Sequence, residues 1–178
     1  MEKKSMLELH RVNCEEYKNV SKIPLVIVLD DIRSLNNIGS IFRTADAFVI
    51  DHIYLCGITA TPPHPDIHKT ALGAEESVTW SYEKSIITII KELKDKDYKI
   101  CAIEQVKGSI SLEQFRVNSE TKYAIIFGNE VKGVQQQVVD VCDCCIEIPQ
   151  CGTKHSLNVS ISAGVVMWEL FKQFNNVL

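Results

Sequence analysis

The sequence lacks any uncharged apolar run approaching the ~18 residues that span a bilayer, so we expect no membrane segment. Its first residues, MEKKSMLELHR, carry charges with no apolar stretch behind them, which argues against a secretory signal peptide. Neither sign of charge dominates, because 19 basic and 23 acidic residues leave a net charge of −4. This balance argues against a protein that coats nucleic acid by bulk charge, and it leaves a local basic face possible.

Several kinds of site are also missing from the sequence. No Walker loop and no GxGxxG fingerprint follows an apolar run, which argues against a nucleotide-binding oxidoreductase. The seven cysteines are an odd number scattered through apolar stretches, a pattern typical of reduced thiols in a cytoplasmic protein. The spacing of metal knuckles is absent, so we expect no metal at two small groups: Cys142, Cys144, Cys145, Cys151 and His155, and His64 with His68.

What the sequence does contain is an alternation of strand-like and helix-like segments within one domain of ordinary size. Strands are expected at 24–29, 51–56, 78–80, 98–104, 123–127 and 144–148, and helices at 5–18, 37–48, 65–71, 83–94, 134–142 and 156–174. This order predicts an α/β fold with a mostly parallel sheet and helices on both faces. Residues 1–22 are expected to form a helical extension, and residues 23–178 the domain itself.

The first candidate loop follows the buried strand that ends at Leu29. Asn37 lies where its amide can cap a helix or hold a ligand. Arg43 lies between apolar residues, where a guanidinium needs a carboxylate or a phosphate as partner. The local pattern alone favours a plain structural interpretation, in which Arg43 forms a salt bridge to Asp46 or Asp30.

The second candidate loop, at 127–133, follows the strand 123–127. Gly128 allows a tight turn or the close approach of a ligand to the backbone. Glu130 could bind a ligand or cap the next helix. Taken alone, this loop also favours the structural interpretation.

The third candidate loop follows the strand that ends near Pro149 and turns at Gly152. Ser156 is the expected N-cap of the long last helix. Asn158 would then lie in the first turn, where free backbone N–H groups point outward. Because ligands of parallel sheets bind beyond the carboxyl ends of the strands, all three loops are candidates for one site.

Taken in order, the three loops match three motifs: N-x-G-x-x-x-R-T-A at 37–45, F-G-x-E-x-x-G at 127–133, and I-P-x-x-G-x-x-x-S-L-N-V-S at 148–160. The set resembles the SpoU (TrmH-like) branch of the SPOUT RNA methyltransferases. The resemblance implies an α/β fold with a deep C-terminal trefoil knot. It also implies transfer of the methyl group of S-adenosylmethionine to a ribose 2′-hydroxyl of RNA, with tRNA favoured and rRNA possible.

The resemblance further implies roles for individual residues. Arg43 would bind the RNA phosphate and orient the 2′-hydroxyl, because a guanidinium stays charged and is a poor base. The residues that would position the ribose, the arginine and the cofactor are Asn37, Glu130, Ser156 and Asn158. The residues that would hold S-adenosylmethionine are Phe127, Gly128, Asn129, Ile148, Gly152 and Leu157. The loop after Leu55 and Cys56 is a further candidate wall of the cofactor pocket.

Finally, the resemblance implies a homodimer with the active site at the subunit interface. Trp168, Phe171 and Phe174, at the end of the last helix, would contact either the partner or the intramolecular core, and the sequence does not separate the two. A different class of function stays open as well: a catalytically silent RNA-binding or assembly factor on the same fold. The presence of Arg43 together with Glu130, Ser156 and Asn158 favours the enzyme.

Overall fold

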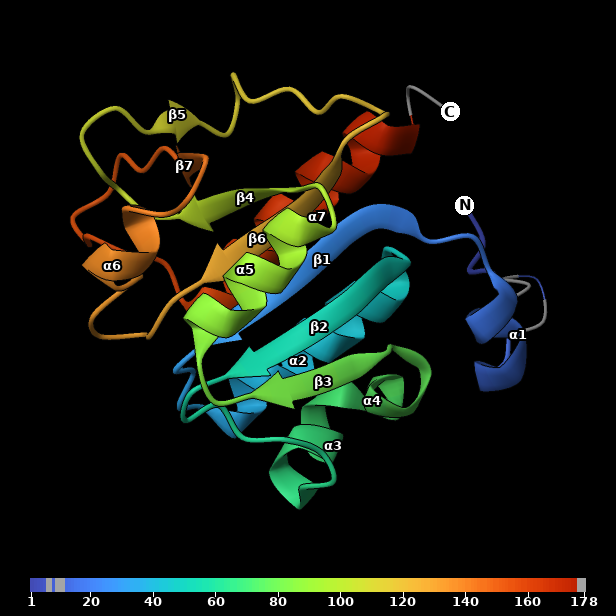
Figure 1. The fold of residues 1–178 in the computed structure, drawn as a ribbon. Helices are drawn as coiled ribbons and strands as arrows, with labels where there is room; N and C mark the ends of the chain where they lie inside the picture. Colours follow the sequence, from blue (N-terminus) through green and yellow to red (C-terminus); the bar gives the residue numbers. More distant parts are fainter. Residues whose placement is uncertain (6–7, 9–11, 176–178) are drawn as a thin grey trace.

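The computed structural model describes residues 1–5, 8 and 12–175, and its centre is one parallel β-sheet (Figure 1). The described residues form seven strands in the order β3-β2-β1-β6-β4-β7-β5, and every pairing between them is parallel. The predicted α/β class and parallel sheet are therefore confirmed. The strands are β1 Ile23–Asp30, β2 Ile50–Cys56, β3 Trp80–Glu83, β4 Tyr98–Ile103, β5 Ile110–Ser111, β6 Lys122–Phe127 and β7 Cys144–Glu147.

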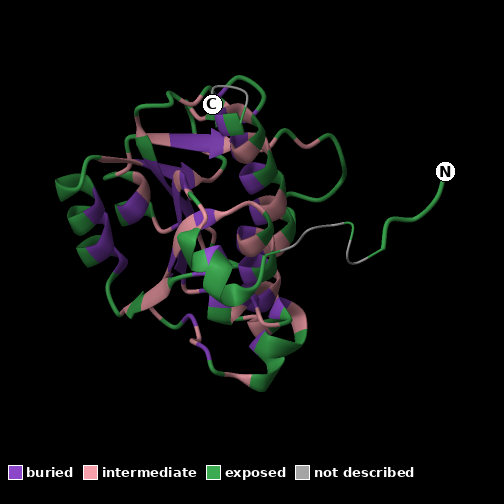
Figure 2. Cartoon of the chain, turned by 90° about the vertical axis from the view of Figure 1, so that its right-hand side faces the viewer, coloured by how far each residue is buried: buried purple, intermediate pink, exposed green. Residues whose placement is uncertain are grey.

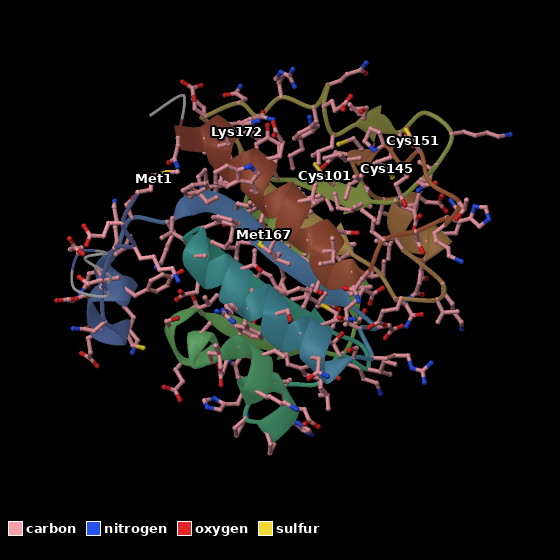
Figure 3. The ribbon with its side chains drawn as sticks, turned by 180° about the vertical axis from the view of Figure 1, so that it is seen from behind. Met1, Cys101, Cys145, Cys151, Met167 and Lys172 are labelled. Carbon is pink, nitrogen blue, oxygen red and sulfur yellow. The ribbon has the colours of Figure 1, made fainter. Side chains whose placement is uncertain are left out.

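Helices cover both faces of this sheet, as predicted. One face packs against α2 (Leu35–Ala47), α3 (Pro65–Ala71), α4 (Ala74–Ser77) and α7 (Val159–Asn175). The other face packs against α5 (Ile86–Asp95) and α6 (Gln136–Val139). Figure 1 shows α5 in front of the sheet, and Figure 3, which views the molecule from behind, shows α2 and α7 side by side in front of the strands.

The central strand β1 explains why the sheet has two cores. Leu25, Ile27 and Leu29 join the cluster under α2 and α7, whereas Val26 and Val28 join the cluster under α5. Successive side chains of a strand point to opposite faces, so an unbroken apolar run can bury both faces at once. The buried strands accordingly fill the interior in Figure 2.

The N-terminal prediction needs correction. The helix α1 spans Cys14–Asn19 and does not begin at Ser5. Asn13 caps the start of α1 with a capping box, in which its side chain accepts from Glu16 N and Glu16 accepts from Asn13 N. Residues 6–7 and 9–11 of the predicted helix lie outside the described part of the chain.

Two predictions in the middle of the chain were also imprecise. The segment 74–77 is helical and β3 begins at Trp80, so the strand predicted at 78–80 lies mostly before its true start. The helix predicted over 134–142 is shortened to α6, because Gln135 has an extended backbone. Among the described residues, none of the helices is both long and apolar enough to traverse a bilayer.

Candidate active site

The carboxyl ends of β4, β6 and β7 open into a cavity of about 580 Å³. This volume lies within the roughly 300–1,000 Å³ that is usual for small-molecule sites. Its walls come from 103–106 after β4, from 127–134 after β6, and from residues after β7 that include Ile148 and 155–157. Parallel strands bring these segments together because their carboxyl ends share one edge of the sheet.

Most of the residues predicted to hold a cofactor line this cavity: Phe127, Gly128, Asn129, Ile148 and Leu157. Gly152 is exposed and does not line it, and a Cβ added there would meet nothing within 4 Å. The predicted wall after Cys56 does not reach the cavity either. The binding roles of all these residues remain predictions.

The loop after β6 is unusually tight, and this explains its two glycines. Gly133 N donates to Asn129 O over 2.8 Å, which folds the loop back on itself. A Cβ on Gly128 would lie 2.4 Å from the backbone of Gly133. Gly133 has φ of +67°, a conformation that favours glycine. Neither position has room for a side chain.

Asn129 joins this loop to the end of β1. Its Oδ1 accepts from the backbone N–H groups of Val131 and Lys132, over 3.0 and 3.1 Å. Its Nδ2 donates to Asp31 O over 2.7 Å. These side-chain hydrogen bonds are all made within the protein, and they stabilise the cavity wall.

Glu130 connects the same loop to the start of α2. Oε1 accepts from Ser34 N at 3.0 Å and from the Asn37 amide at 3.2 Å, while Oε2 accepts from Arg33 N at 3.1 Å. Partial burial raises the pKa of Glu130, but these hydrogen bonds outweigh it and lower the pKa below its ordinary value. The carboxylate is therefore charged at neutral pH and lies at the positive end of the helix dipole.

Asn158 completes the connection from the third motif. Its Nδ2 donates to Asn37 Oδ1 over 3.2 Å, and its Oδ1 accepts from Ser160 N over 2.9 Å. Asn158 thus caps α7, and the prediction that Ser156 does so is wrong. Ser156 lies in the exposed loop before the helix and lines the cavity. We call the connected side chains of Glu130, Asn37 and Asn158 the three-residue bridge.

Arg43 lies on α2, exposed and outside the cavity lining. Within the described residues it forms no ion pair, so the alternative of a salt bridge to Asp46 or Asp30 is wrong. Asp46 instead accepts from Ser77 Oγ, and Asp30 accepts from Gln135 Nε2. The guanidinium is therefore available to a partner outside this chain.

The sequence reasoning missed the wall that follows β4. Glu104 lines the cavity, and its carboxylate accepts from Val134 N over 2.8 Å and from Gln105 N over 2.9 Å. It also fills the space that a side chain on Gly133 would need. The available signal was a carboxylate at the carboxyl end of a predicted buried strand. No group of three or more potential metal ligands occurs among the residues placed by the structure.

Comparison with known proteins gives a consistent assignment. The model of the SpoU rRNA Methylase family matches residues 24–168. The 23S rRNA (guanosine-2′-O-)-methyltransferase RlmB of Neisseria meningitidis serogroup B is 31% identical over 156 residues, which cover 88% of this chain and 61% of that protein. The chain spans 61% to 64% of the length of the curated relatives that it matches.

Solved structures show the same fold. The TrmH/SpoU tRNA modifying enzyme of A. aeolicus superposes with a TM-score of 0.81 at 23% identity, covering 92% of this chain and 83% of that one. An AdoMet-bound rRNA methyltransferase from Sinorhizobium meliloti superposes with a TM-score of 0.79, also at 23% identity, and covers 88% and 59% of the two chains.

Proposed function

The chain belongs to the SpoU rRNA Methylase family, and on that premise we propose that it transfers a methyl group from S-adenosylmethionine to a ribose 2′-hydroxyl of RNA. The observation that carries the proposal is the three-residue bridge, which joins all three motifs beside the cavity. The name of the Neisseria relative supports the ribose hydroxyl as the acceptor.

The cavity suits S-adenosylmethionine in both size and lining. This cofactor supplies a methyl group on a positively charged sulfonium, so its site needs apolar walls for the adenine and carboxylates for the cation. Ile103, Phe127 and Ile148 provide apolar surface, and Glu104 and Glu147 provide carboxylates. The tight loop at 127–133 presents backbone N–H and C=O groups that would hold the adenine and the ribose.

Because the methyl donor is already activated, the protein has to align the 2′-oxygen with the sulfur and help to remove the hydroxyl proton. Arg43 binds the RNA phosphate and orients the 2′-hydroxyl, a role that its unpaired guanidinium fits. Asn37, Glu130 and Asn158 hold the start of α2 in place, and Ser156 faces the ribose. Each of these groups positions the reactants, and none of them accepts the proton of the 2′-hydroxyl.

We also propose that two copies of the chain pair through the exposed face of α7. Ile161, Val165 and Trp168 lie at helical spacing and are 57%, 40% and 52% exposed. Phe171 is half-buried against the core, and its ring lies 6.1 Å from that of Trp168, so it borders the exposed patch. Phe174 is buried, which assigns it to the intramolecular core. Such a dimer would bring Arg43 to a shared interface.

The C-terminal trefoil knot that the resemblance implies is also part of this proposal.

The substrate and the compartment follow as finer proposals. A compact acidic chain suits a structured RNA that is recognised by shape and phosphates, which favours tRNA over rRNA. The seven cysteines are all free thiols, as expected for a protein of the cytoplasm.

The test is a methyl-transfer assay with labelled S-adenosylmethionine on unmodified tRNA and, separately, on rRNA. Nuclease digestion and mass spectrometry then identify the methylated nucleoside. We expect a 2′-O-methylated nucleoside that is lost in Arg43→Ala and kept in the control Lys91→Ala, which changes an exposed residue on the opposite side of the sheet. Cofactor binding by calorimetry should be retained in both variants.

Two outcomes would contradict the proposal. If the Arg43→Ala variant transferred methyl groups to RNA as well as the wild type, Arg43 would not have the role proposed for it. Absence of both transfer and cofactor binding in the wild-type chain would favour the silent RNA-binding or assembly factor instead.

A further inference from the structure

Two cysteines that the proposed chemistry does not use lie side by side in the sheet. Cys101 in β4 and Cys144 in β7 are register partners on adjacent parallel strands, and their Sγ atoms are 3.3 Å apart. Both side chains pack into the core under α7, Cys101 fully buried and Cys144 half-buried. Figure 3 labels Cys101 in this upper part of the molecule.

The strand geometry allows these two sulfurs to bond. Neighbouring strands run about 4.7–4.9 Å apart. The Cα atoms of disulfides are separated by about 4.4–6.8 Å, so the backbone spacing already lies within that range. The sulfurs would have to approach from 3.3 Å to a bond of about 2.05 Å, a movement that side-chain rotation and a small shift of β7 can supply.

The two thiols differ in pKa, and this difference indicates which sulfur is the nucleophile. The Cys101 and Cys144 thiols are within hydrogen-bond distance of each other, and this contact lowers the pKa of the Cys144 thiol. Burial instead raises the pKa of Cys56 and of Cys142, in each case to about 12. Since the thiolate is the reactive form, Cys144 should react with an oxidant before these two thiols.

We propose that Cys101 and Cys144 form an oxidation site for peroxides, and that the resulting disulfide weakens the binding of S-adenosylmethionine. The first part stands on the thiol pair alone, whereas the effect on the cofactor rests on the proposed function. β4 continues into the cavity wall at 103–106, and β7 continues into the wall at Glu147 and Ile148. The small shift of β7 that the covalent bond requires would therefore move one wall of the cavity relative to the other.

The reaction balances with hydrogen peroxide as the oxidant. The Cys144 thiolate attacks one peroxide oxygen and the O–O bond breaks, which leaves a sulfenic acid and a hydroxide that takes up the released thiol proton. The Cys101 sulfur then attacks the sulfenic sulfur. The S–S bond forms, the S–O bond breaks, and the oxygen leaves as water with the Cys101 proton. Two thiols lose two electrons in all, and one peroxide becomes two waters.

The experiment treats the reduced full-length chain with increasing hydrogen peroxide, then measures intact mass, cross-linked peptides and cofactor affinity. We expect the loss of two hydrogen atoms, a cross-link between Cys101 and Cys144, and a parallel loss of affinity that dithiothreitol reverses. The Cys144→Ser variant should form no cross-link, and its affinity for S-adenosylmethionine should stay unchanged in peroxide. Cys151→Ser, which changes an exposed cysteine in the loop beyond β7, should behave as wild type.

Other results would overturn the proposal in distinguishable ways. A cross-link through Cys151, or oxidation of Cys144 to a sulfinic acid without a cross-link, would refute the dithiol. A complete Cys101–Cys144 cross-link with unchanged affinity would refute the effect on the cavity. If the reduced wild-type chain bound no cofactor, the proposed function would fail while the cross-link could still be measured.

Discussion

Replacing Asp30 with asparagine should stabilise the protein at neutral and alkaline pH. The carboxyl group of Asp30 is at the end of β1 and only 2% exposed. Burial and the adjacent charge of Asp31 raise its pKa from 3.8 to about 6, against a smaller opposing effect of the hydrogen bond from Gln135. The asparagine side chain cannot ionise, and its oxygen can still accept that hydrogen bond.

The size and the sign of the effect follow from proton linkage. The folded state holds the Asp30 proton more tightly than the unfolded state, so ionisation opposes folding. This penalty is absent below about pH 4, grows as the pH rises, and is complete above about pH 6. The rise of the Asp30 pKa from 3.8 to about 6 corresponds to about 3 kcal/mol in the free energy of unfolding.

Urea unfolding, followed by circular dichroism between about pH 4 and pH 8, measures the difference directly. The gain of Asp30→Asn over wild type should approach about 3 kcal/mol at pH 8 and vanish near pH 4. The control Asp95→Asn changes an exposed residue of α5 and should give no such trend. If the stability gained by Asp30→Asn did not depend on pH, or if the variant were less stable than wild type at pH 8, ionisation of Asp30 would not oppose folding and the reasoning would be refuted.

Three further changes test loops that follow the parallel strands. Gly128→Ala places a Cβ 2.4 Å from the Gly133 backbone and should abolish cofactor binding in calorimetry, whereas Gly152→Ala, in open space, should not. Glu130→Gln turns an amide N–H₂ towards backbone donors; methyl transfer should fall, and urea unfolding should show a loss of about 1 kcal/mol. Thr59→Val removes a buried hydroxyl bonded to two backbone groups and should cost about 1–3 kcal/mol in the same assay, with Thr59→Ser close to wild type.

The sheet could be predicted from the sequence because its signals are local. The apolar run at 24–29 indicates burial on both faces, and the structure uses it as β1 between β2 and β6. The three motif loops were expected at one site because parallel strands end at a common edge. The same logic, applied to the strand at 98–104, would have found Glu104, which no motif contained.

Features that depend on distant partners could not be predicted in this way. Both Ser156 and Asn158 are good helix caps, and the residue that caps α7 also bonds to Asn37, far away in the sequence. The two-residue strand β5 exists only through its pairing with β7. The partners of Asp30 and Asp46 are side chains from other elements, which is why the salt bridge expected for Arg43 did not form.

The three-residue bridge also has a consequence for synthesis of the chain on the ribosome. Its two hydrogen bonds join residues separated by 93 and 121 positions, so no nascent fragment that ends before Asn158 can contain the finished site. Contacts of such long range form late and slowly, because the intervening chain must first be ordered. Cofactor binding should therefore mark the completion of folding, and it would distinguish the mature protein from any partly folded form that already has its central strands.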